Sequence, residues 1–493
     1  MKLILGGPGC GKTTRLIRIV QEELDAGVPP EEIAFVAFTK AAAREARARA
    51  AEAFGLDPEA RLPWFRTIHS LAYRLLGLTR EEIMDRRDWR EFAELVGQPI
   101  SGVYDADLGS TTSATAQMGD RYLRVVDYAS TTLTSLADSY HEVGQDLDWW
   151  AVLQFDETFR RFKASIAKLD FTDILLSYLD EGAAVPVRVA VIDEAQDLTA
   201  AQWAVVRRAF SSASRVYIGG DDDQAIYRWA GADVDQFLNL PATPEILAHS
   251  HRLPRSIFRV GQRITSNIRH RYPKPYQPSD REGMVEWHHE LESIRLGGAG
   301  TWLLLARNGY MLEKLEALAI AQGVPYSRRD GPVAREEEVE AIALHSSLRS
   351  GSAHDISARE ARVLYKALGR PRPALRELGR YGAEELEVPL GVSWYGIMSG
   401  IPRARLDYYL ECMKVGEDLR REPRVRVETI HGVKGAEADK VLLMLDMSFR
   451  TAQSFEADPD HEHRVFYVGA TRAREELHIL APQTRISYPG LVG

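Results

Sequence analysis

One glycine-rich stretch near the start of the chain constrains its fold more than any other feature. Residues 6–14 read GGPGCGKTT, which fits the pattern GxxxxGK[ST] and lies between an apolar run at residues 3–5 and a helix-like run at residues 15–20. Glycines in this setting let backbone N–H groups face a polyphosphate, while Lys12 reaches the outer phosphates and Thr13 offers a hydroxyl to Mg²⁺. The stretch therefore predicts a phosphate-binding loop (P-loop) between a strand and a helix.

Strands and helices alternate along two parts of the chain. Residues 33–38 form a continuous apolar run, typical of a strand buried in a parallel sheet, and Thr39 then caps a helix over residues 41–54 that Gly55 ends. Further strands are predicted at residues 187–192, 215–218, 302–306, 424–429, 441–445 and 477–480. The alternation predicts an α/β fold with parallel sheets.

Two mostly helical stretches interrupt this alternation. The first is rich in aromatic and acidic residues, and the second is punctuated by glycine and proline. We therefore expect two α/β lobes, each carrying one insertion. The expected limits are residues 1–80 and 166–250 for the first lobe, 81–165 for its helical insertion, 251–349 and 421–493 for the second lobe, and 350–420 for a short second insertion.

Length and composition exclude several classes of protein. A chain of 493 residues is too long for one core, and its formal charge of −9 argues against binding nucleic acid through overall basicity. No apolar run is long enough to cross a membrane, and no signal peptide precedes the first strand. Cys10 and Cys412 are too far apart in sequence to indicate a disulfide framework or a zinc knuckle. We expect a cytoplasmic protein without a membrane partner, in which any nucleic-acid site is local.

Carboxylates follow two of the predicted strands. The run VIDEAQD at residues 191–197 places Asp193 and Glu194 at one strand end, and GDDDQ at residues 220–224 follows another. Ligands bind at this edge of open parallel sheets. Asp193 can hold Mg²⁺ together with Thr13, and Glu194 can orient or deprotonate an attacking water. The alternative, a helix N-cap pair without chemistry, remains open for the acids alone. With a P-loop in the same lobe they favour hydrolysis of a nucleoside triphosphate.

Further motifs follow in a fixed order. They are AFTKAAA at residues 37–43, TIHS at 67–70, GDDDQAIYRW at 220–229, SHR at 250–252, ETIHGVKGAE at 428–437 and YVGATRA at 467–473. Together with the P-loop and DEAQD they span nearly the whole chain and resemble the superfamily 1 DNA helicases of the UvrD, Rep and PcrA type. The resemblance implies two RecA-like P-loop lobes with ATP in the cleft between them and single-stranded DNA running across both.

The resemblance also assigns roles at the nucleotide. Gln224 is similar to the family glutamine that senses the γ-phosphate, while Arg252 and Arg472 match the arginines that the second lobe presents to it. A guanidinium suits that role because it spreads positive charge over phosphoryl oxygens. Glu437 matches a residue near the ribose, and His251 stands where the family usually carries a tyrosine stacked on adenine. The P-loop contacts expected with ATP come from Gly9, Cys10, Gly11, Lys12, Thr13 and Thr14.

For DNA, the resemblance implicates hydroxyls and aromatic rings near strand ends. Hydroxyls and backbone groups can hold phosphates, and aromatic faces can stack on bases without regard to sequence. Core packing is the competing interpretation for each aromatic residue, and the arginines of helix 41–54 favour a solvated face. The residues implicated are Phe38, Thr39, Thr67, His69, Tyr227, Trp229 and His431.

The chain departs from the family pattern in several places. Only Met1 and Lys2 precede the first strand, where the family has a glutamine-containing segment that reads adenine, so relaxed base selectivity is expected. Trp229-Ala230-Gly231 replaces the family's Trp-Arg-Gly, and the second insertion is short. We also expect no extended tail or fused nuclease after the last strand. Thiol alkylation at Cys10 is expected to block ATP binding if the sulfur lies near the phosphates.

The leading hypothesis is an ATP-dependent, Mg²⁺-dependent DNA helicase that translocates 3′ to 5′ on single-stranded DNA and acts at single/double-strand junctions, with the polarity implied by resemblance alone. An alternative is a translocase that removes bound proteins without processive unwinding. A small-molecule P-loop kinase and a non-enzymatic DNA-binding scaffold are the competitors from other classes. Partner proteins of DNA repair, replication or recombination are compatible with the family but are not specified by the sequence.

Overall fold

The described residues of the chain form two units. The computed structural model describes residues 1–55, 57, 61–101, 104–105, 110–111, 117–371 and 374–491. The first unit consists of residues 1–282 and 453–471, and the second of residues 283–452 and 472–493. Within the described residues, no helix is both long enough and apolar enough to cross a membrane.

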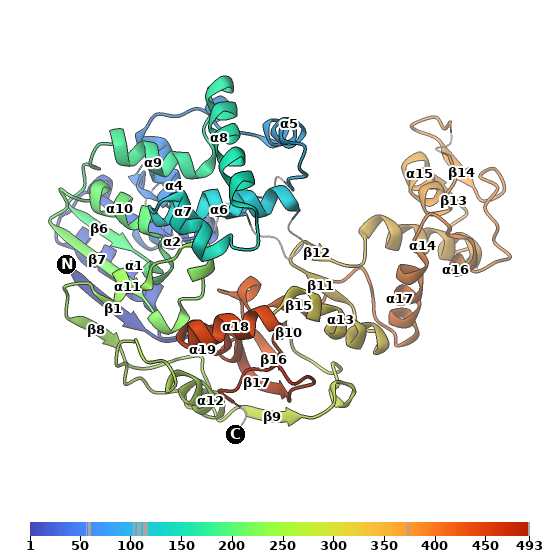
Figure 1. The fold of residues 1–493 in the computed structure, drawn as a ribbon. Coiled ribbons are helices and arrows are strands. Elements are labelled where there is room, and N and C mark those ends of the chain that lie inside the picture. The colour runs from blue at the N-terminus through green and yellow to red at the C-terminus, as the bar shows by residue number, and fades with distance from the viewer. Residues whose placement is uncertain are drawn as a thin grey trace. The chain divides into compact units, whose positions relative to one another are not determined.

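The first unit is built on a six-stranded parallel sheet with the order β3-β2-β6-β7-β1-β8. Strands β6, β7, β1 and β8 follow one another in Figure 1. Each neighbouring pair runs in the same direction, for example Ile4 opposite Gly219. The strands are β1 Lys2–Gly6, β2 Ile33–Ala37, β3 Phe65–Thr67, β6 Val189–Ile192, β7 Arg215–Gly220 and β8 Pro244–Leu247.

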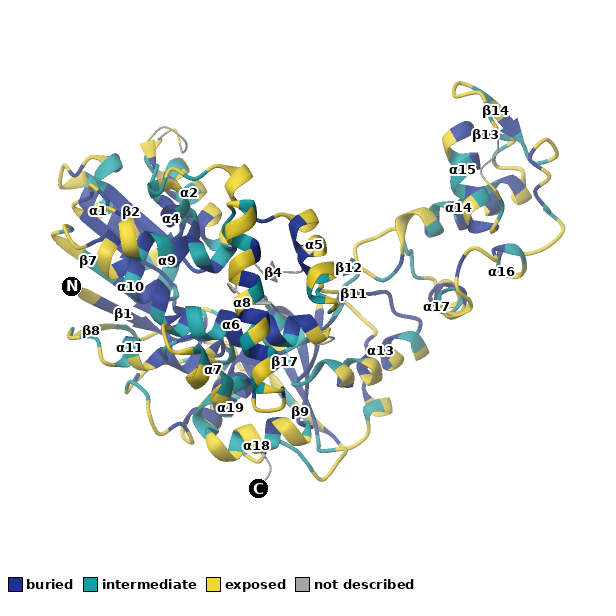
Figure 2. Ribbon diagram, turned by 45° about the horizontal axis from the view of Figure 1, so that its top comes forward, coloured by how far each residue is buried: buried dark blue, intermediate teal, exposed yellow. Residues whose placement is uncertain are grey.

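The central strands are apolar because both faces of the sheet are covered. Every residue of β2 and β6 is buried, and β2 appears in the buried colour beside helices with exposed outer faces (Figure 2). Parallel strands covered on both faces read as continuous apolar runs, which is why the sequence located them.

Local capping signals set the ends of the first unit's helices. Thr39 accepts a hydrogen bond from the Ala42 N–H at 3.1 Å and begins α2, and Gly55 ends α2 with φ 61°. The helices are α1 Lys12–Asp25, α2 Lys40–Phe54, α4 Ile68–Leu75, α5 Arg86–Val96, α6 Met118–Thr132, α7 Leu136–Val143, α8 Trp149–Ile166, α9 Phe171–Glu181, α10 Ala200–Ala209, α11 Val234–Leu238, α12 Arg255–Thr265 and α19 Pro459–Ala470.

Helices α5, α6 and α8 share an aromatic core around Phe92 and Phe159. A short antiparallel pair, β4 Tyr104–Asp105 and β5 Ser110–Thr111, lies between α5 and α6 in sequence.

The second unit has a seven-stranded sheet with the order β12-β11-β15-β10-β16-β17-β9. All pairs are parallel except β11 with β12. The strands are β9 Met284–His288, β10 Trp302–Ala306, β11 Tyr326–Arg328, β12 Gly331–Pro332, β15 Val425–Thr429, β16 Ala438–Met444 and β17 Ala473–Leu480. Helix α13, Leu312–Ala321, packs on this sheet, and α18 spans Phe449–Ala457.

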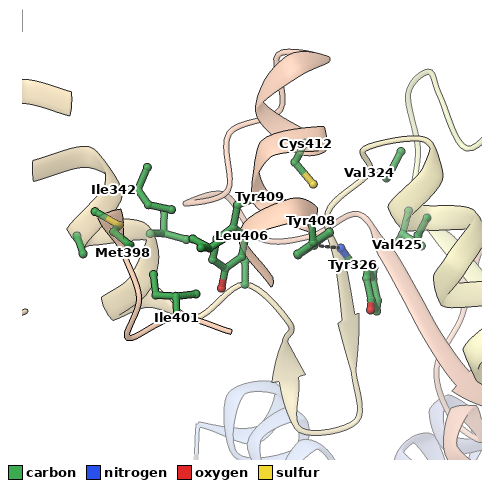
Figure 3. Packing of buried hydrophobic residues seen from close by; sticks show 14 of the residues in the cluster. Val324, Tyr326, Ile342, Met398, Ile401, Leu406, Tyr408, Tyr409, Cys412 and Val425 are labelled. Atoms are coloured by element: carbon green, nitrogen blue, oxygen red, sulfur yellow. Dashed lines mark hydrogen bonds between the residues drawn. The ribbon is translucent and has the colours of Figure 1, made fainter. Parts of the chain in front are cut away.

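A helical group in the second unit has its own apolar packing, continuous with that of the sheet. Tyr408, Tyr409, Leu406 and Ile342 meet the side chains near β11 and β15, and the Tyr408 hydroxyl accepts a hydrogen bond from the Tyr326 N–H at 3.1 Å (Figure 3). The elements of this group are α14 Glu336–Ser350, α15 Ala358–Ala367, α16 Trp394–Ile397, α17 Arg403–Lys414, β13 Asp355–Ser357 and β14 Arg380–Gly382.

The expected fold class, α/β with two parallel-sheet lobes that each carry a mostly helical insertion, is confirmed. Every strand predicted from an apolar run lies on an observed strand. Residues 251–282, including α12, belong to the first unit together with α19. The domain limits expected from the sequence remain predictions.

The packing of α17 generates a prediction about stability. Leu406 is 3% exposed, whereas Met413 on the same helix is 44% exposed. Leu406→Ala should lower the free energy of unfolding by about 2–5 kcal/mol, because it removes buried methyl groups and leaves a cavity. Denaturant unfolding followed by tryptophan fluorescence measures this change. Met413→Ala is the control and should leave the transition nearly unchanged, and equal effects of the two substitutions would contradict the packing.

Candidate functional site

The P-loop joins β1 to α1 through glycines in the left-handed region. Gly9 has φ 73° and Gly11, which precedes the first residue of α1, has φ 77°. Other residues rarely adopt these angles, so the loop needs glycine there. A helix N-terminus with free N–H groups beside such a loop is suited to binding phosphate. The backbone therefore has the form that the sequence predicted.

Lys12 and Thr13 reach the ends of strands β1 and β6, between which β7 lies in the sheet. The Lys12 ammonium donates to the Gly6 carbonyl at 3.0 Å. The Thr13 hydroxyl donates to Asp193 Oδ2 at 2.8 Å, although the two residues are 180 positions apart. Asp193 directly follows β6, so the strand end delivers its carboxylate to the start of α1. The structure thus brings together the two residues predicted to hold Mg²⁺.

Burial and charge act on the Asp193 carboxyl. Burial, followed by the negative charge of Glu194, raises the pKa of Asp193 to about 6, against the lowering effects of Thr13 and Lys12. Glu194 itself has φ 53°, a strained conformation for a side chain of this size. Its carboxylate accepts a hydrogen bond from Gln196 at 2.5 Å. The surroundings therefore hold a second carboxylate beside Asp193 in one orientation.

The segment after β8 lies directly on the P-loop. The Ser250 hydroxyl donates to the Pro8 carbonyl at 2.7 Å, and the His251 N–H donates to the Gly9 carbonyl at 3.0 Å. A side chain at Gly9 would collide with Arg252, since a Cβ there would lie 2.4 Å from the Arg252 Cβ. Arg252 also donates to the Thr471 carbonyl at 3.3 Å. One of the two predicted arginines thus lies beside the phosphate loop, while the His251 side chain is exposed.

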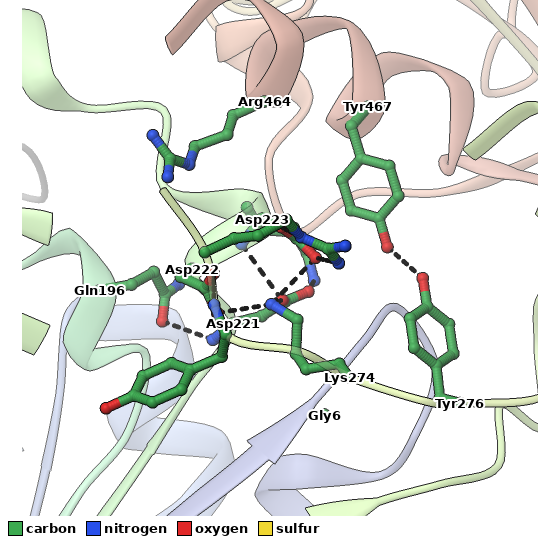
Figure 4. Close-up of polar contacts among 12 residues, drawn as sticks. Gly6, Gln196, Asp221, Asp222, Asp223, Lys274, Tyr276, Arg464 and Tyr467 are labelled. Carbon is green, nitrogen blue, oxygen red and sulfur yellow. Dashed lines mark hydrogen bonds and ion pairs between the residues drawn. The ribbon is translucent and has the colours of Figure 1, made fainter. Parts of the chain in front are cut away.

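Gln224 belongs to a buried cluster of three aspartates (Figure 4). The Gln224 amide donates to Asp221 Oδ2 at 2.6 Å, and the Asp221 N–H donates to the Gln196 side chain at 3.0 Å. The Lys274 ammonium contacts all three carboxylates, at 2.8 Å from Asp221 and 2.9 Å from Asp223. The Arg271 guanidinium forms a two-pronged pair with Asp223. Gln224 is therefore held at the edge of a charge-compensated network.

The aspartates of this network differ in how far the positive charge of Lys274 offsets the effect of burial on their pKa. Burial raises the pKa of Asp221, but the positive charges of Lys274 and Lys12 and the hydrogen bonds from Lys274 and Gln224 together outweigh it, and the net shift is downward. For Asp222, burial outweighs Lys274 and its pKa is raised. The three carboxylates hold the pKa of Lys274 well above its usual range despite burial. Lys274 is therefore a permanent cation beneath the strand end.

Tyr276, which is paired with Tyr467, lies beside the P-loop. A Cβ at Gly7 would lie 2.7 Å from the Tyr276 ring, so this glycine is needed for close approach. The Tyr276 hydroxyl is hydrogen-bonded to that of Tyr467 on α19 (Figure 4). Burial raises the pKa of both phenols, which stay protonated.

In the second unit, Arg472 and Glu437 lie in one neighbourhood. Arg472 is buried and donates to the Ala436 carbonyl at 3.4 Å, and the Ala438 N–H donates to the Arg472 carbonyl. The Glu437 carboxylate accepts from Arg474 at 2.7 Å. His431 follows β15 in the same unit and is half-buried. The paired starts of β16 and β17 account for this arrangement.

The residues implicated in DNA binding are placed in three different ways. Thr39 and Thr67 cap α2 and α4 with their hydroxyls. The rings of Phe38 and Tyr227 stack on each other with centroids 5.5 Å apart, and both residues are buried. The His69 ring stacks on Phe171 at 4.1 Å. Burial, with a smaller effect of Lys40, lowers the pKa of His69 to about 3, so this ring stays neutral.

Trp229 is the half-exposed aromatic residue of the predicted set. It follows the Gln224 turn and is partly accessible to solvent, whereas Phe38 and Tyr227 are buried. Partial exposure is compatible with base stacking on Trp229.

Sequence reasoning missed Lys274, Arg271 and Tyr276, and it gave no role to Gln196 and Ser250, although both lie in the motifs quoted above. Lys274 lies 53 positions from Asp221, and no motif or spacing links the two. The three consecutive aspartates were the usable signal, because like charges at the end of a buried strand require a nearby cation.

Lys274 gives a prediction about stability. Lys274→Ala should lower the free energy of unfolding by about 3–5 kcal/mol, because it leaves buried carboxylates without their shared cation. Denaturant unfolding measures the loss. The control is Lys414→Ala, which removes an exposed pair with Glu411 and should cause no measurable change. An unchanged transition for Lys274→Ala would contradict the network.

Cys10 gives a prediction about reactivity. The residue is 6% exposed, and burial, partly opposed by Lys12, raises its pKa to about 11 from an ordinary value of 9.0. Because the thiolate is the reacting form, alkylation by iodoacetamide at pH 8 should be about a hundredfold slower than for an exposed cysteine in a short peptide. Mass spectrometry separates modification at Cys10 from that at Cys412. A rate equal to that of the peptide would show that the thiol is neither buried nor suppressed.

Two sequence families match the chain. The UvrD/REP helicase N-terminal domain matches residues 1–245, and the UvrD-like helicase C-terminal domain matches residues 409–484. The first match contains the P-loop, Asp193 and Gln224, and the second contains Glu437 and Arg472.

Similar curated proteins carry the name ATP-dependent DNA helicase PcrA. The protein from Staphylococcus aureus Mu50 is 25% identical over 309 residues, covering 59% of this chain and 42% of the relative. That from Staphylococcus epidermidis RP62A is 26% identical over 288 residues, covering 55% and 39%. The chain spans about two fifths of the length of these relatives.

A solved structure of arterivirus nonstructural protein 10, a helicase, aligns with this chain at 11% sequence identity. The alignment covers 98% of this chain and 60% of the viral chain, and its TM-score of 0.33 is too low to bear on the fold. The family matches and the PcrA relatives agree with each other and with the motifs along the chain. The chain therefore belongs to the UvrD/REP family of helicases.

Proposed function

We propose that the protein is a DNA-dependent ATPase that couples ATP hydrolysis to translocation on single-stranded DNA with 3′-to-5′ polarity and to duplex unwinding. The hydrogen bond between Thr13 and Asp193 carries this proposal, since it joins the P-loop to the acidic end of β6. A P-loop that only bound nucleotide would not need a second carboxylate, Glu194, held beside this pair.

The donor set fits Mg²⁺ and ATP. A hydroxyl oxygen and a carboxylate oxygen 2.8 Å apart at the start of a helix are the ligand types that Mg²⁺ takes beside nucleotide phosphates. Thr13 and Asp193 would hold the ion, which would neutralise charge on the phosphates when bound. Lys12 and the N–H groups after Gly9 would bind the phosphates, and Glu194 would orient the attacking water.

Two arginines are proposed to act on the γ-phosphate. The position of Arg252 beside Gly9 supports its role, because a guanidinium near this loop can pair with phosphoryl oxygens. Arg472 takes the second role by its resemblance to the family arginine. Gln224, bonded to Asp221, is proposed to connect the nucleotide with the DNA side, since Trp229 follows it by five positions. His251 and Glu437 are proposed to contact the base and the ribose.

DNA is proposed to contact the end of the first sheet and the turn at His431. The caps Thr39 and Thr67 lie at helix N-termini, where phosphates are favoured, and Trp229 offers a partly exposed ring. The buried residues Phe38, Tyr227 and His69 would support this surface from below, unless the bound single-stranded DNA displaces them. We propose junctions between single and double strands as the substrate.

The test is ATP hydrolysis by the purified chain with and without single-stranded DNA. DNA should stimulate the rate, and Lys12→Ala should lower the stimulated rate by at least about a hundredfold, because it removes a cation that stabilises phosphoryl charge. Lys314→Ala removes an exposed lysine on α13 and should leave the rate unchanged. Turnover that is indifferent to DNA would point instead to a small-molecule P-loop kinase.

Duplexes with a 3′ or a 5′ single-stranded tail complete the same experiment. Displacement of the strand from the 3′-tailed duplex alone agrees with the proposed polarity. Brisk DNA-stimulated hydrolysis without displacement would favour a translocase that removes bound proteins, and displacement from the 5′-tailed duplex alone would reverse the polarity.

A further inference from the structure

Two histidines and a glutamate meet on one face of the second unit's sheet, away from the P-loop in sequence. Glu286 and His288 are two positions apart on β9, so their side chains point to the same face of the strand. On the neighbouring parallel strand, His478 of β17 is directly opposite Glu286. The register of these two strands therefore places three metal-binding side chains together.

The three facing atoms have the separations of a metal's ligand shell. His288 Nε2 lies 3.0 Å from His478 Nδ1, and Glu286 Oε2 lies 3.8 Å from the first nitrogen and 3.6 Å from the second. A triangle with these sides has a centre about 2.0 Å from each corner, which equals the usual distance of nitrogen and oxygen ligands from Zn²⁺.

The hydrogen bonds behind the rings favour protons on the outer nitrogens. The Ser293 hydroxyl donates to the Glu290 carbonyl at 2.7 Å, so its oxygen accepts the proton of His288 Nδ1 at 3.1 Å. Glu476 is a carboxylate, and it accepts from His478 Nε2 at 3.2 Å. Neutral imidazoles protonated on these outer nitrogens present bare lone pairs on the two inner nitrogens.

The two inner nitrogens lie 3.0 Å apart, so either a proton shared in a hydrogen bond or a metal ion must lie between or beside them. The outer contacts are those that orient metal-binding histidines in proteins, where the second ring nitrogen donates to a carboxylate or another acceptor. Lys440 pairs with Glu476 at 3.1 Å and helps to hold that side chain in place. The Trp302 ring packs against His478 in a tilted arrangement, with centroids 4.9 Å apart and an interplanar angle of 32°.

We propose that Glu286, His288 and His478 form a binding site for one divalent transition-metal ion of the Zn²⁺ class. The two histidines are buried, whereas the Glu286 side chain is 52% exposed, so water can reach a fourth coordination position. Nitrogen and carboxylate ligands favour Zn²⁺, Co²⁺ or Ni²⁺ over Mg²⁺ and Ca²⁺, which prefer oxygen ligands. The site is separate from Thr13 and Asp193 and does not depend on the proposed function.

The experiment is a titration of the metal-stripped full chain with Co²⁺, in which binding is monitored through the visible ligand-field absorption of the ion. Zn²⁺ is then added to displace the bound Co²⁺. We expect one equivalent to bind at this site. Glu286→Gln should weaken binding by at least about tenfold, because it removes one of three ligands. Glu290→Gln, an exposed glutamate four positions away, is the matched control and should bind like the wild type.

A second measurement distinguishes the loss of a metal ligand from misfolding of the variant. Zn²⁺ should raise the melting temperature of the wild type and of the exposed control His289→Ala, because an ion that binds the folded state stabilises it, but not that of His478→Ala. Circular dichroism of each metal-free variant checks the fold. Failure of the wild type to bind Co²⁺, or equal binding by Glu286→Gln and Glu290→Gln, would overturn the site and leave the two rings sharing only a proton.

Discussion

The parallel pairing of β1, β6 and β7 is the constraint on which the candidate nucleotide site depends. Leu5 lies opposite Gly220 and Ile192 lies opposite Ile218, so three strands finish at one edge of the sheet. The residues that follow these strands include the P-loop, Asp193 and Asp221. Phosphate-binding groups and carboxylates therefore gather at one place because of strand register, before any side chain contributes.

This gathering creates an electrostatic problem that the rest of the first unit resolves. Asp193, Asp221, Asp222 and Asp223 are all buried, and a buried carboxylate without a partner is strongly unfavourable. Lys274 compensates three of them, and Thr13 donates to the fourth. A buried ion cluster adds little net stability compared with apolar packing, but it fixes the positions of its members. Gln224 is positioned through this network, whereas the segment that carries Arg252 is held by hydrogen bonds to the P-loop.

The sequence was sufficient to predict the fold class, the strands and the P-loop because these follow from local patterns. Apolar runs located the buried strands, and glycine spacing located the loop. The pairing of Thr13 with Asp193 was also predictable, since both lie at the same sheet edge. Lys274 could not be assigned, because its partners lie about fifty positions away. The mutual stacking of Phe38 and Tyr227, and the meeting of Glu286 with His478, depend on tertiary contacts for which single residues give no signal.

The order of strands in the second sheet has a consequence for how the chain folds during synthesis. Strand β9 is an edge strand, and its partner in the sheet is β17, which begins 189 positions after the start of β9. Until the ribosome has released β17, β9 exposes unpaired backbone groups, and β16 lacks its neighbour on one side. Contacts between such distant segments form slowly, because the intervening chain must first be ordered. The first unit also includes α19, which is synthesised late because it lies near the end of the sequence. Neither unit can therefore complete its fold before most of the chain is made.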